Sequence, residues 1–307
     1  MRAKSVVCIG AALIDESYRC EYQPLAGTSN PASLHRSAGG VARNIAHHLA
    51  LLGNPVELIT HFGNDPEGQW LMDQCATSRI GLSHALVNDI PTGRFVALLS
   101  PEGDLFAGAV STHFETLITP DFLQKRIPVL KEASLLQIDC NLSAESLNWL
   151  MQFSRNEKIP CIIEPVSVPK AARLKKTNMN GVLLITPNHD EMAAINGETE
   201  EELVQTILDL GVRYLWLRKG KEGSILYSEQ NPFELSAPEV QIIDTTGAGD
   251  AALAGCIHAW LHDQKPEDCV RYGHAMASLV LQINGAIRKD LDIQLLEETF
   301  NHIFLNE

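Results

Sequence analysis

Short strand-like runs, several of them continuously apolar, alternate along this chain of 307 residues with longer segments of helical periodicity. A run that is apolar on both faces is typical of a strand in a parallel sheet that helices cover on both sides. Strands that alternate with helices predict an α/β architecture with a mostly parallel central sheet flanked by helices. The runs interpreted as core strands are residues 5–9, 56–60, 135–138, 161–163, 182–185, 214–217 and 224–226.

The segments between these runs carry apolar stripes with the spacing of helices that pack one face on a core. They include residues 41–52, 144–156, 200–210 and 292–304. Two other stretches, about 16–36 and 91–112, read as short strands with no helix between them. We interpret these two stretches as a small β-sheet lid over one end of the large sheet, which could exclude water from a reacting group.

The composition is that of a soluble globular protein, with 45% hydrophobic and 20% charged residues. No linker or repeat interrupts residues 1–307, so the sequence predicts a single domain that carries the lid. A net charge of -14 argues against nucleic-acid binding, and no apolar run reaches the ~20 residues of a membrane span. Seven scattered cysteines, with no C-x-x-C pair and no targeting segment before the first strand, predict a cytoplasmic protein.

A glycine turn lies between a strand-like run and a buried helix late in the chain. The run is residues 240–243, the turn at 244–251 reads Asp-Thr-Thr-Gly-Ala-Gly-Asp-Ala, and an apolar helical segment follows at 251–261. The first amides of such a helix have no partner within it, and they lie at the positive end of the helix dipole. The turn therefore predicts an anion-binding site, which the acidity of the chain does not exclude.

The anion site would consist of the amides of Gly247, Ala248 and Gly249, with the carboxylate of Asp250 beside it. With an ordinary pKa of about 3.9, Asp250 should be ionised at neutral pH and able to accept a hydroxyl proton. An anion hole with an adjacent base is suited to moving a phosphoryl group onto an alcohol. The spacing also fits the loose dinucleotide fingerprint, but the segment after the helix reads as another helix rather than a strand. A capping aspartate at an ordinary helix start is the remaining alternative.

A second glycine motif lies early in the chain, where Gly39 and Gly40 precede a helix that carries Asn44. Paired glycines allow a ligand to approach the backbone closely, and Asn44 offers both a donor and an acceptor. Asp15 follows the first strand and should lie at the same carboxyl end of the sheet, where ligands bind in open α/β folds. These groups are suited to holding the vicinal hydroxyls of a sugar, although a glycine pair before a helix can also be purely structural.

Together the two glycine motifs resemble the signatures of the ribokinase-like, or pfkB, family of carbohydrate and nucleoside kinases. Gly39 and Gly40 with Asn44 resemble the early signature, and residues 244–250 resemble the late one, about 200 residues further on. The resemblance spans nearly the whole chain. It implies a mostly parallel sheet with a β lid, and ATP-dependent phosphorylation of a sugar hydroxyl. It also implies that Asp250 is the general base, that the late glycine turn is the anion hole, and that the early motif holds the sugar.

Two further segments resemble the nucleotide site of this family. Asn188 and Glu191 match its N-x-x-E segment, which acts near Mg²⁺ and the ATP phosphates, although the same spacing makes a helix capping box. Gly220 and Gly223 match the glycines of its nucleotide loop, T-x-G-x-x-G. Arg218 stands where that loop has Thr or Ser, which changes the side chain available to the phosphates.

Other positions in the family pattern carry weaker likenesses. His274 falls near the place where the family often has Asn beside the adenine, and it could equally be an ordinary helix residue. Lys219 is a second cationic side chain in the nucleotide loop that could contact phosphates. Asp244 and Thr246, with the loop at 285–288, resemble the monovalent-cation site of the family. The resemblance therefore implies ATP and Mg²⁺, and it admits K⁺ at this loop.

Several segments resemble the pseudouridine kinase branch of the family. They surround Asn30 in the lid, Asp139 and Asn141 after a core strand, and the Pro-Val-Ser at 165–167. The amide and acid groups of the first three could bind the uracil edge and the ribose. Without a ligand role, Asn30 would be a turn residue and Asn141 a helix N-cap.

Two features depart from that branch, since Glu164 stands where Asp is usual and Ser111-Thr112 replaces an Asn-Asp pair in the lid. The resemblance nevertheless implies phosphorylation of the 5′-hydroxyl of a ribosyl substrate, with pseudouridine preferred. The nearest alternative is a kinase for a free sugar or a conventional nucleoside, and a second is a non-catalytic nucleotide- or sugar-binding sensor. The expected partners are a small molecule rather than nucleic acid or membrane, and a second copy joined through the lid.

Overall fold

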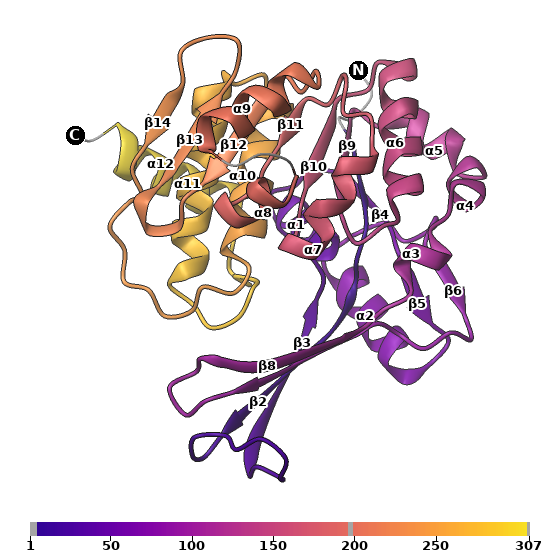
Figure 1. The fold of residues 1–307 in the computed structure, drawn as a ribbon, viewed down its shortest axis with the longest axis vertical. Coiled ribbons are helices and arrows are strands. Elements are labelled where there is room, and N and C mark those ends of the chain that lie inside the picture. Colours follow the sequence, from indigo (N-terminus) through magenta and orange to yellow (C-terminus); the bar gives the residue numbers. More distant parts are fainter. Residues whose placement is uncertain (1–4, 196–198, 306–307) are drawn as a thin grey trace.

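A sheet of eight strands forms the centre of the molecule, in the order β14-β13-β12-β11-β10-β9-β1-β4 (Figure 1). The computed structural model describes residues 5–195 and 199–305. Every pairing from β4 to β12 is parallel, whereas β13 and β14 join antiparallel. The strands are β1 (Val6–Ile9), β4 (Val56–Ile59), β9 (Leu135–Asp139), β10 (Cys161–Glu164), β11 (Leu184–Ile185), β12 (Tyr214–Arg218), β13 (Ser224–Tyr227) and β14 (Phe233–Leu235).

Helices cover both faces of this sheet, as the sequence predicts for an α/β fold (Figure 1). One face packs against α1 (Val41–Leu51), α2 (Pro66–Thr77), α10 (Ala248–Leu261), α11 (Pro266–Leu281) and α12 (Ile293–Phe304). The other packs against α3 (Phe114–Leu117), α4 (Pro120–Gln124), α5 (Ile127–Glu132), α6 (Ala144–Glu157), α7 (Val168–Ala171), η1 (Ala172–Lys176), α8 (His189–Ile195) and α9 (Glu200–Asp209). Within the described ranges, every helix is too short or too polar to serve as a membrane span.

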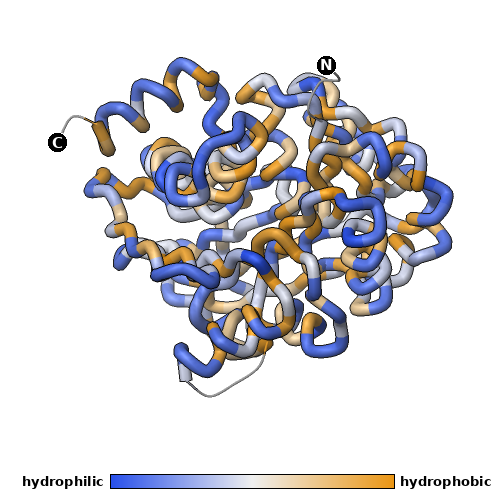
Figure 2. The backbone as a smooth tube through the Cα atoms, turned by 90° about the horizontal axis from the view of Figure 1, so that it is seen from above, coloured by the Kyte–Doolittle hydropathy of each residue, from blue (hydrophilic) through white to orange (hydrophobic). Residues whose placement is uncertain are grey.

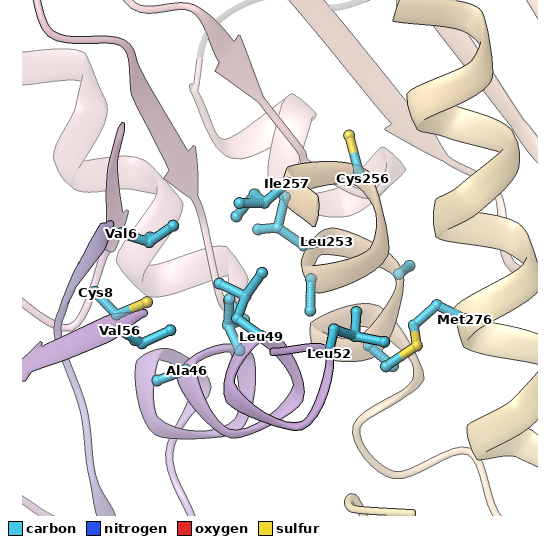
Figure 3. Packing of buried hydrophobic residues seen from close by; sticks show 14 of the residues in the cluster. Val6, Cys8, Ala46, Leu49, Leu52, Val56, Leu253, Cys256, Ile257 and Met276 are labelled. Atoms are coloured by element: carbon cyan, nitrogen blue, oxygen red, sulfur yellow. The ribbon is translucent and has the colours of Figure 1, made fainter. Parts of the chain in front are cut away.

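The strand β1 shows why a central strand can be apolar at every position. Val6 and Cys8 point into the core beneath α1 and α10, whereas Val7 and Ile9 point into the core on the opposite face. All four are buried, because neither face of the sheet meets water. Figure 3 shows Val6 and Cys8 on the side of the sheet that Leu49 of α1 approaches. In Figure 2, hydrophobic segments gather inside the molecule, whereas α12, next to the C-terminus, alternates between hydrophobic and hydrophilic residues along its length.

A smaller sheet of four strands extends from one end of the body, in the order β3-β2-β7-β8 (Figure 1). Its strands are β2 (Leu13–Cys20), β3 (Ala32–Gly39), β7 (Arg94–Leu99) and β8 (Leu105–Ser111), and they come from the two stretches that the sequence assigned to a lid. β2 and β3 pair from Leu13 and Gly39 at the base to Cys20 and Ala32 at the outer end. A two-stranded sheet of β5 (His61–Gly63) and β6 (Leu86–Asn88) completes the described strands, and η2 (Gly220–Glu222) links β12 to β13.

One expectation about local structure is wrong. Residues 240–243 form no strand, and Ile242 and Ile243 are exposed. The segment follows the edge strand β14 along the chain, and Ile243 N donates to Leu281 O of α11 at 2.8 Å. Among the described residues, no backbone hydrogen bond joins the segment to a strand, so its β-branched residues find no strand to pair with. Asp15 follows the core strand β1 along the chain and lies within β2, at the base of the lid.

The packing of α1, α10 and α11 determines where the glycine motifs lie. A side chain at Gly255 would come within 2.6 Å of Tyr272 O, so this glycine lets α10 and α11 approach closely. On its other side α10 packs against α1, and Figure 3 shows Leu49 of α1 facing Leu253 and Ile257. The two helices that follow the glycine motifs therefore share one core, which brings their first turns together.

Candidate active site

The late glycine turn ends at the first turn of α10, which begins at Ala248 after the N-cap residue Gly247. Gly247 has a left-handed backbone with φ 74°, and a Cβ at this position would come within 2.5 Å of Ala286. Only glycine satisfies both conditions without strain. In the described part of the chain, the amides of Gly249 and Asp250 have no hydrogen-bond partner. The turn thus presents unpaired donors at the positive end of a helix of 14 residues.

Asp250 lies beside these amides and is joined to the early glycine motif. The Nδ2 of Asn44 donates a hydrogen bond of 2.7 Å to its Oδ2, across 206 residues of sequence. Burial raises the pKa of Asp250 to about 7, and Glu164 adds to the shift, whereas Asn44, Arg218 and Arg43 oppose it. The expectation that Asp250 is fully ionised at neutral pH is therefore corrected, because the sequence does not reveal how completely this carboxyl is withdrawn from water.

Arg43 orients the amide that contacts Asp250, a role that sequence reasoning missed. The side chain is buried, with the residue 1% exposed, and it hydrogen-bonds the Oδ1 of Asn44 and the carbonyl of Ala38. Its Nε also donates to the carbonyl of Gly39 at 3.2 Å. Because a guanidinium can only donate, the oxygen of Asn44 must face Arg43, and its NH₂ group is left to face Asp250.

Asp15 lies against the paired glycines. A side chain at Gly39 would collide with the Asp15 carboxylate, and Gly40, with φ 97°, has no room for a Cβ beside the carbonyl of Ala11. Burial raises the pKa of Asp15 to about 6, although the positive charge of Arg43 opposes the shift. The structure thus groups Asp15, Gly39, Gly40 and Asn44 at the base of the lid, next to Asp250.

Asp139 and Asn141 lie behind this group. Asp139 is fully buried, and its Oδ2 accepts from the amides of Ala11 and Ala42 at 2.9 and 3.1 Å, while its Oδ1 accepts from Asn141 N at 2.9 Å. Burial raises its pKa and these amide bonds oppose the rise. The N-cap of α6 is Ser143, so the structural alternative for Asn141 as a helix cap is wrong. Asp139 therefore holds three backbone segments in place.

Asn30 lies far from the other candidates along the lid. Its Oδ1 accepts from Leu25 N at 2.8 Å, and its Nδ2 donates to the carbonyls of Leu25 and Thr28 at 3.0 and 3.3 Å. The residue closes the loop between β2 and β3, beyond the outer pair Cys20 and Ala32. In this structure its polar atoms serve the loop, and the structure does not bring it to the base of the lid.

A cavity of about 780 Å³ opens beside Asp250, which is a size suited to a nucleotide-sized ligand. It runs between the end of β12, the first turn of α10 and the segment at 237–242. The structure brings the nucleotide candidates to this cavity together with the anion turn. The candidates that line it are Asn188, Glu191, Arg218, Gly220, Gly223, Ala248, Gly249, Asp250 and His274.

Asn188 and Glu191 form a reciprocal cap at the wall of this cavity. The Oδ1 of Asn188 accepts from Glu191 N, and the Oε2 of Glu191 accepts from Asn188 N, both at 2.9 Å. Burial and the neighbouring carboxylate of Glu164 raise the pKa of Glu191. The hydrogen bond from Asn188 N and the positive charge of Arg218 lower it, but by less. The capping box is thus formed, and it fixes a buried carboxylate at the edge of the cavity.

His274 borders the opposite wall of the cavity, on α11. One ring nitrogen, Nε2, lies 2.7 Å from Ser224 Oγ, and the ring packs near Trp216 with 6.4 Å between centroids. Burial lowers the pKa of His274 to about 4, so the ring is neutral at physiological pH. A neutral ring beside an indole suits an uncharged, flat partner better than a phosphate.

Asp244 and Thr246 fix the loop that leads into the anion turn. Asp244 Oδ1 accepts from the amide and hydroxyl of Thr246 at 2.9 and 2.7 Å, and its Oδ2 accepts from Gly285 N at 2.9 Å. His48 of α1 lies with its Nε2 3.0 Å from the carbonyl of Ala286. The described residues contain no cluster of three or more His, Cys, Asp or Glu side chains that could hold a metal ion.

Known proteins with similar sequences and structures identify the family of this chain. The model of the pfkB family carbohydrate kinases matches residues 3–293. The chain belongs to the pfkB family of carbohydrate kinases. Pseudouridine kinase of Escherichia coli K12 is 30% identical to it over 95% of this chain and 96% of that protein, and ribokinase of Arabidopsis thaliana is 26% identical over 93% and 78%. The structure of Arabidopsis thaliana ribokinase complexed with ribose and ATP matches with a TM-score of 0.84 at 24% identity, over 98% and 99% of the two chains.

The family membership agrees with the resemblance that the two glycine motifs predicted. A pfkB fold confirms the large, mostly parallel sheet with a smaller sheet at one end. It does not by itself identify the alcohol that is phosphorylated, because relatives at this level of identity include both pseudouridine kinase and ribokinase.

The raised pKa of Asp250 makes a prediction about stability. A carboxyl whose pKa rises from 3.8 to about 7 on folding favours the folded state at low pH, and that contribution is lost as the pH rises through this interval. Asp250→Asn keeps the shape of the side chain and removes its titration. We expect the Tm of the variant to exceed that of the wild type by an amount that grows from pH 4 to pH 7 and then levels off.

Thermal unfolding at half-unit pH steps from 4 to 8.5 measures this difference. Asp104→Asn, at an exposed lid position, is the control for removing a carboxylate without burial. A Tm difference for Asp250→Asn that stays constant across the interval would contradict the raised pKa.

Proposed function

We propose that this chain transfers the γ-phosphoryl group of ATP to the 5′-hydroxyl of a ribosyl substrate, with pseudouridine preferred. The hydrogen bond between Asn44 and Asp250 carries the proposal, because it joins the proposed base in the first turn of α10, where two amides are unpaired, to a proposed sugar ligand of α1. Membership of a kinase family and the 30% identity to a pseudouridine kinase support it.

Asp250 would act as the general base. Its carboxylate takes the proton of the substrate hydroxyl while that oxygen forms a bond to the γ-phosphorus and the bond to the bridging oxygen of ADP breaks. The unpaired amides of the turn at residues 247–250, those of Gly249 and Asp250, stabilise the negative charge on the moving group, whereas Ala248 N already donates to Thr245 O at 3.3 Å. Asn44 and Arg43 keep the carboxylate of Asp250 aimed at the hydroxyl by fixing its Oδ2.

The sugar would lie at the base of the lid, held by Asp15, Asn44 and the backbone of Gly39 and Gly40. Their grouping beside Asp250 supports this position. Asn30, Asp139 and Asn141 remain the proposed candidates for reading the base and ribose. Because Asp139 already accepts three amides, its influence would pass through the backbone that it holds.

ATP would occupy the cavity beside Asp250, with Gly220, Gly223 and His274 around the nucleoside and Asn188, Glu191 and Arg218 towards the phosphates. The volume of the cavity and the unpaired amides at its end fit a nucleotide with its phosphates at α10. Mg²⁺ would arrive with ATP and neutralise phosphate charge, held mainly by phosphate oxygens and water near Glu191. K⁺ would bind the loop that Asp244 and Thr246 fix to Gly285.

The lid would join two copies of the chain. β8 is an edge strand whose seven residues are all exposed, and it presents Leu105, Phe106 and Val110 to solvent at 62%, 49% and 55% exposure. An uncovered apolar edge strand favours association, and a second copy would cover it.

The seven buried free cysteines support our further proposal of a reducing, cytoplasmic setting, which cell fractionation would check.

The substrate can be tested by measuring ATP consumption with pseudouridine, uridine and free ribose. Pseudouridine has a carbon glycosidic bond and therefore an extra ring N–H that uridine lacks. If the site has an acceptor for this N–H, that acceptor is left unpaired when uridine binds. We expect kcat/KM for pseudouridine to exceed the value for the other two by about tenfold or more. A preference for ribose or equal use of uridine would identify the alternative sugar or nucleoside kinase, and ATP consumption with none of a wider panel would favour the sensor.

The role of Asp250 can be tested with Asp250→Asn at pH 8, where the wild-type carboxyl is ionised. We expect turnover to fall by ~10²–10⁴-fold, the usual scale for loss of a general base, while calorimetric affinities for ATP and the nucleoside change little. In the wild type, kcat/KM should fall about tenfold per pH unit below 7. Near-normal turnover in a folded variant would remove Asp250 from this role.

Dimerisation through the lid can be tested with the double variant Phe106→Glu and Val110→Glu, measured by light scattering after gel filtration. Two like charges on each facing strand should convert a dimer into a monomer, since like charges across an interface repel. Val168→Glu, at an exposed apolar position outside the lid, is the control and should stay dimeric. A wild type that is already monomeric at micromolar concentration would contradict the proposal.

A further inference from the structure

Arg218 and Glu164, which both depart from the family pattern, form an ion pair. Arg218, in place of the loop Thr or Ser, ends β12, and Glu164, in place of the usual Asp, ends β10. The Nη2 of Arg218 donates to the Oε1 of Glu164 at 2.7 Å, across 54 residues of sequence. The side chains are 18% and 5% exposed, so this ion pair is largely out of water. The two departures therefore belong to one structural feature.

Glu164 is anchored on its other side, so it can hold Arg218 in one orientation. Its Oε2 accepts from the hydroxyl of Thr186 at 2.6 Å, and its Oε1 accepts from Val166 N at 3.3 Å. Val166 has a φ of 74°, a left-handed conformation that a β-branched residue adopts only under strain. A second carboxylate, that of Glu191, lies 3.9 Å from the same Nη2.

The opposite edge of the guanidinium faces the anion turn. A Cβ at Gly249 would lie 2.7 Å from the Nη1 of Arg218, so the guanidinium lies directly over the first turn of α10. The Nε is buried without a hydrogen-bond partner in the described part of the chain, and Nη1 has none there either. Burial alone would lower the pKa of Arg218, but Glu164 and Glu191 outweigh it, so the group stays charged.

The neighbouring lysine of the loop points elsewhere. The Nζ of Lys219 donates to Glu200 Oε1 at 2.9 Å, and the hydroxyl of Tyr227 donates to the same oxygen at 3.0 Å. Lys219 does not line the cavity, whereas Arg218 does. Of these two cations, Arg218 therefore lines the cavity and Lys219 does not, while Lys221 further along the loop also lines it.

We propose that Arg218 binds the γ-phosphoryl group of ATP through Nη1 and follows it during transfer, with Glu164 as the residue that positions it. This inference rests on the proposed function. A guanidinium supplies a positive charge and directed donors to phosphate oxygens, and it gains or loses no proton. It would offset the negative charge of Asp250, Glu164 and Glu191 at the end of the cavity, where the hydroxyl of the usual loop residue supplies no charge.

The test measures binding without any sugar, by calorimetry with a non-hydrolysable ATP analogue and with ADP in the presence of Mg²⁺. Arg218→Met should weaken the analogue by about 10- to 100-fold, the scale of charged hydrogen bonds, and should weaken ADP by less than about threefold. Lys219→Met removes the adjacent charge and should change neither affinity. Glu164→Gln should weaken the analogue by an intermediate factor, since Arg218 remains without its anchor.

Arg218→Met leaves two buried carboxylates without their cation and could unfold the chain. The double variant Arg218→Thr with Glu164→Asp restores the usual pair of residues, and we expect it to fold and to discriminate between the analogue and ADP less than the wild type does. Equal loss of analogue and ADP affinity, or faster turnover without Arg218, would overturn the inference. If the analogue depends on Arg218 but no alcohol is phosphorylated by the wild type, the proposed function fails and the phosphate contact stands.

Discussion

The hydrogen bond from Asn44 to Asp250 is the contact on which the rest of the site depends. It joins α1 to α10 across 206 residues, so it exists only after the central sheet and both helices have assembled. Arg43 fixes the amide on one side, and Gly247, pressed against Ala286, fixes the turn on the other. The carboxylate is therefore held by the fold itself rather than by a local loop, which is the condition for a preorganised base.

The site holds several charged side chains that are buried from water, where an isolated charge destabilises the folded state. Asp250, Glu164 and Glu191 are carboxylates near one another, and the positive charges of Arg218 and Arg43 lower the pKa of Asp250. Burial raises the pKa of Asp250 to about 7, which makes it a stronger base than an exposed aspartate. The same burial reduces the stability of the folded state at neutral pH. If Asp250 is the general base, as proposed, reactivity and stability are opposed at this residue.

The sequence was most informative where burial is uniform. The strands β1, β9 and β10 are mostly apolar and are buried at every position, which a sheet covered by helices on both faces explains. It failed at residues 240–243, since the β-propensity of that segment meets no neighbouring strand. It could not show that Asp250 is withdrawn from water or that Arg43 is buried, because these follow from packing between distant helices. The pairing of Glu164 with Arg218 was equally hidden, since each looked like an isolated departure.

The strands of the lid begin and end at the residues proposed to grip the sugar. β2 leaves the body through Asp15, and β3 returns to it at Gly39, directly before α1. A hinge of the lid would therefore lie in the same few peptide units as the proposed ligand contact. Any swing of the lid must rotate these groups, and any ligand that fixes them must restrain the swing. Binding of the sugar and closure of the lid would then be thermodynamically coupled. Replacing the lid with that of a relative would therefore also change the affinity for the sugar.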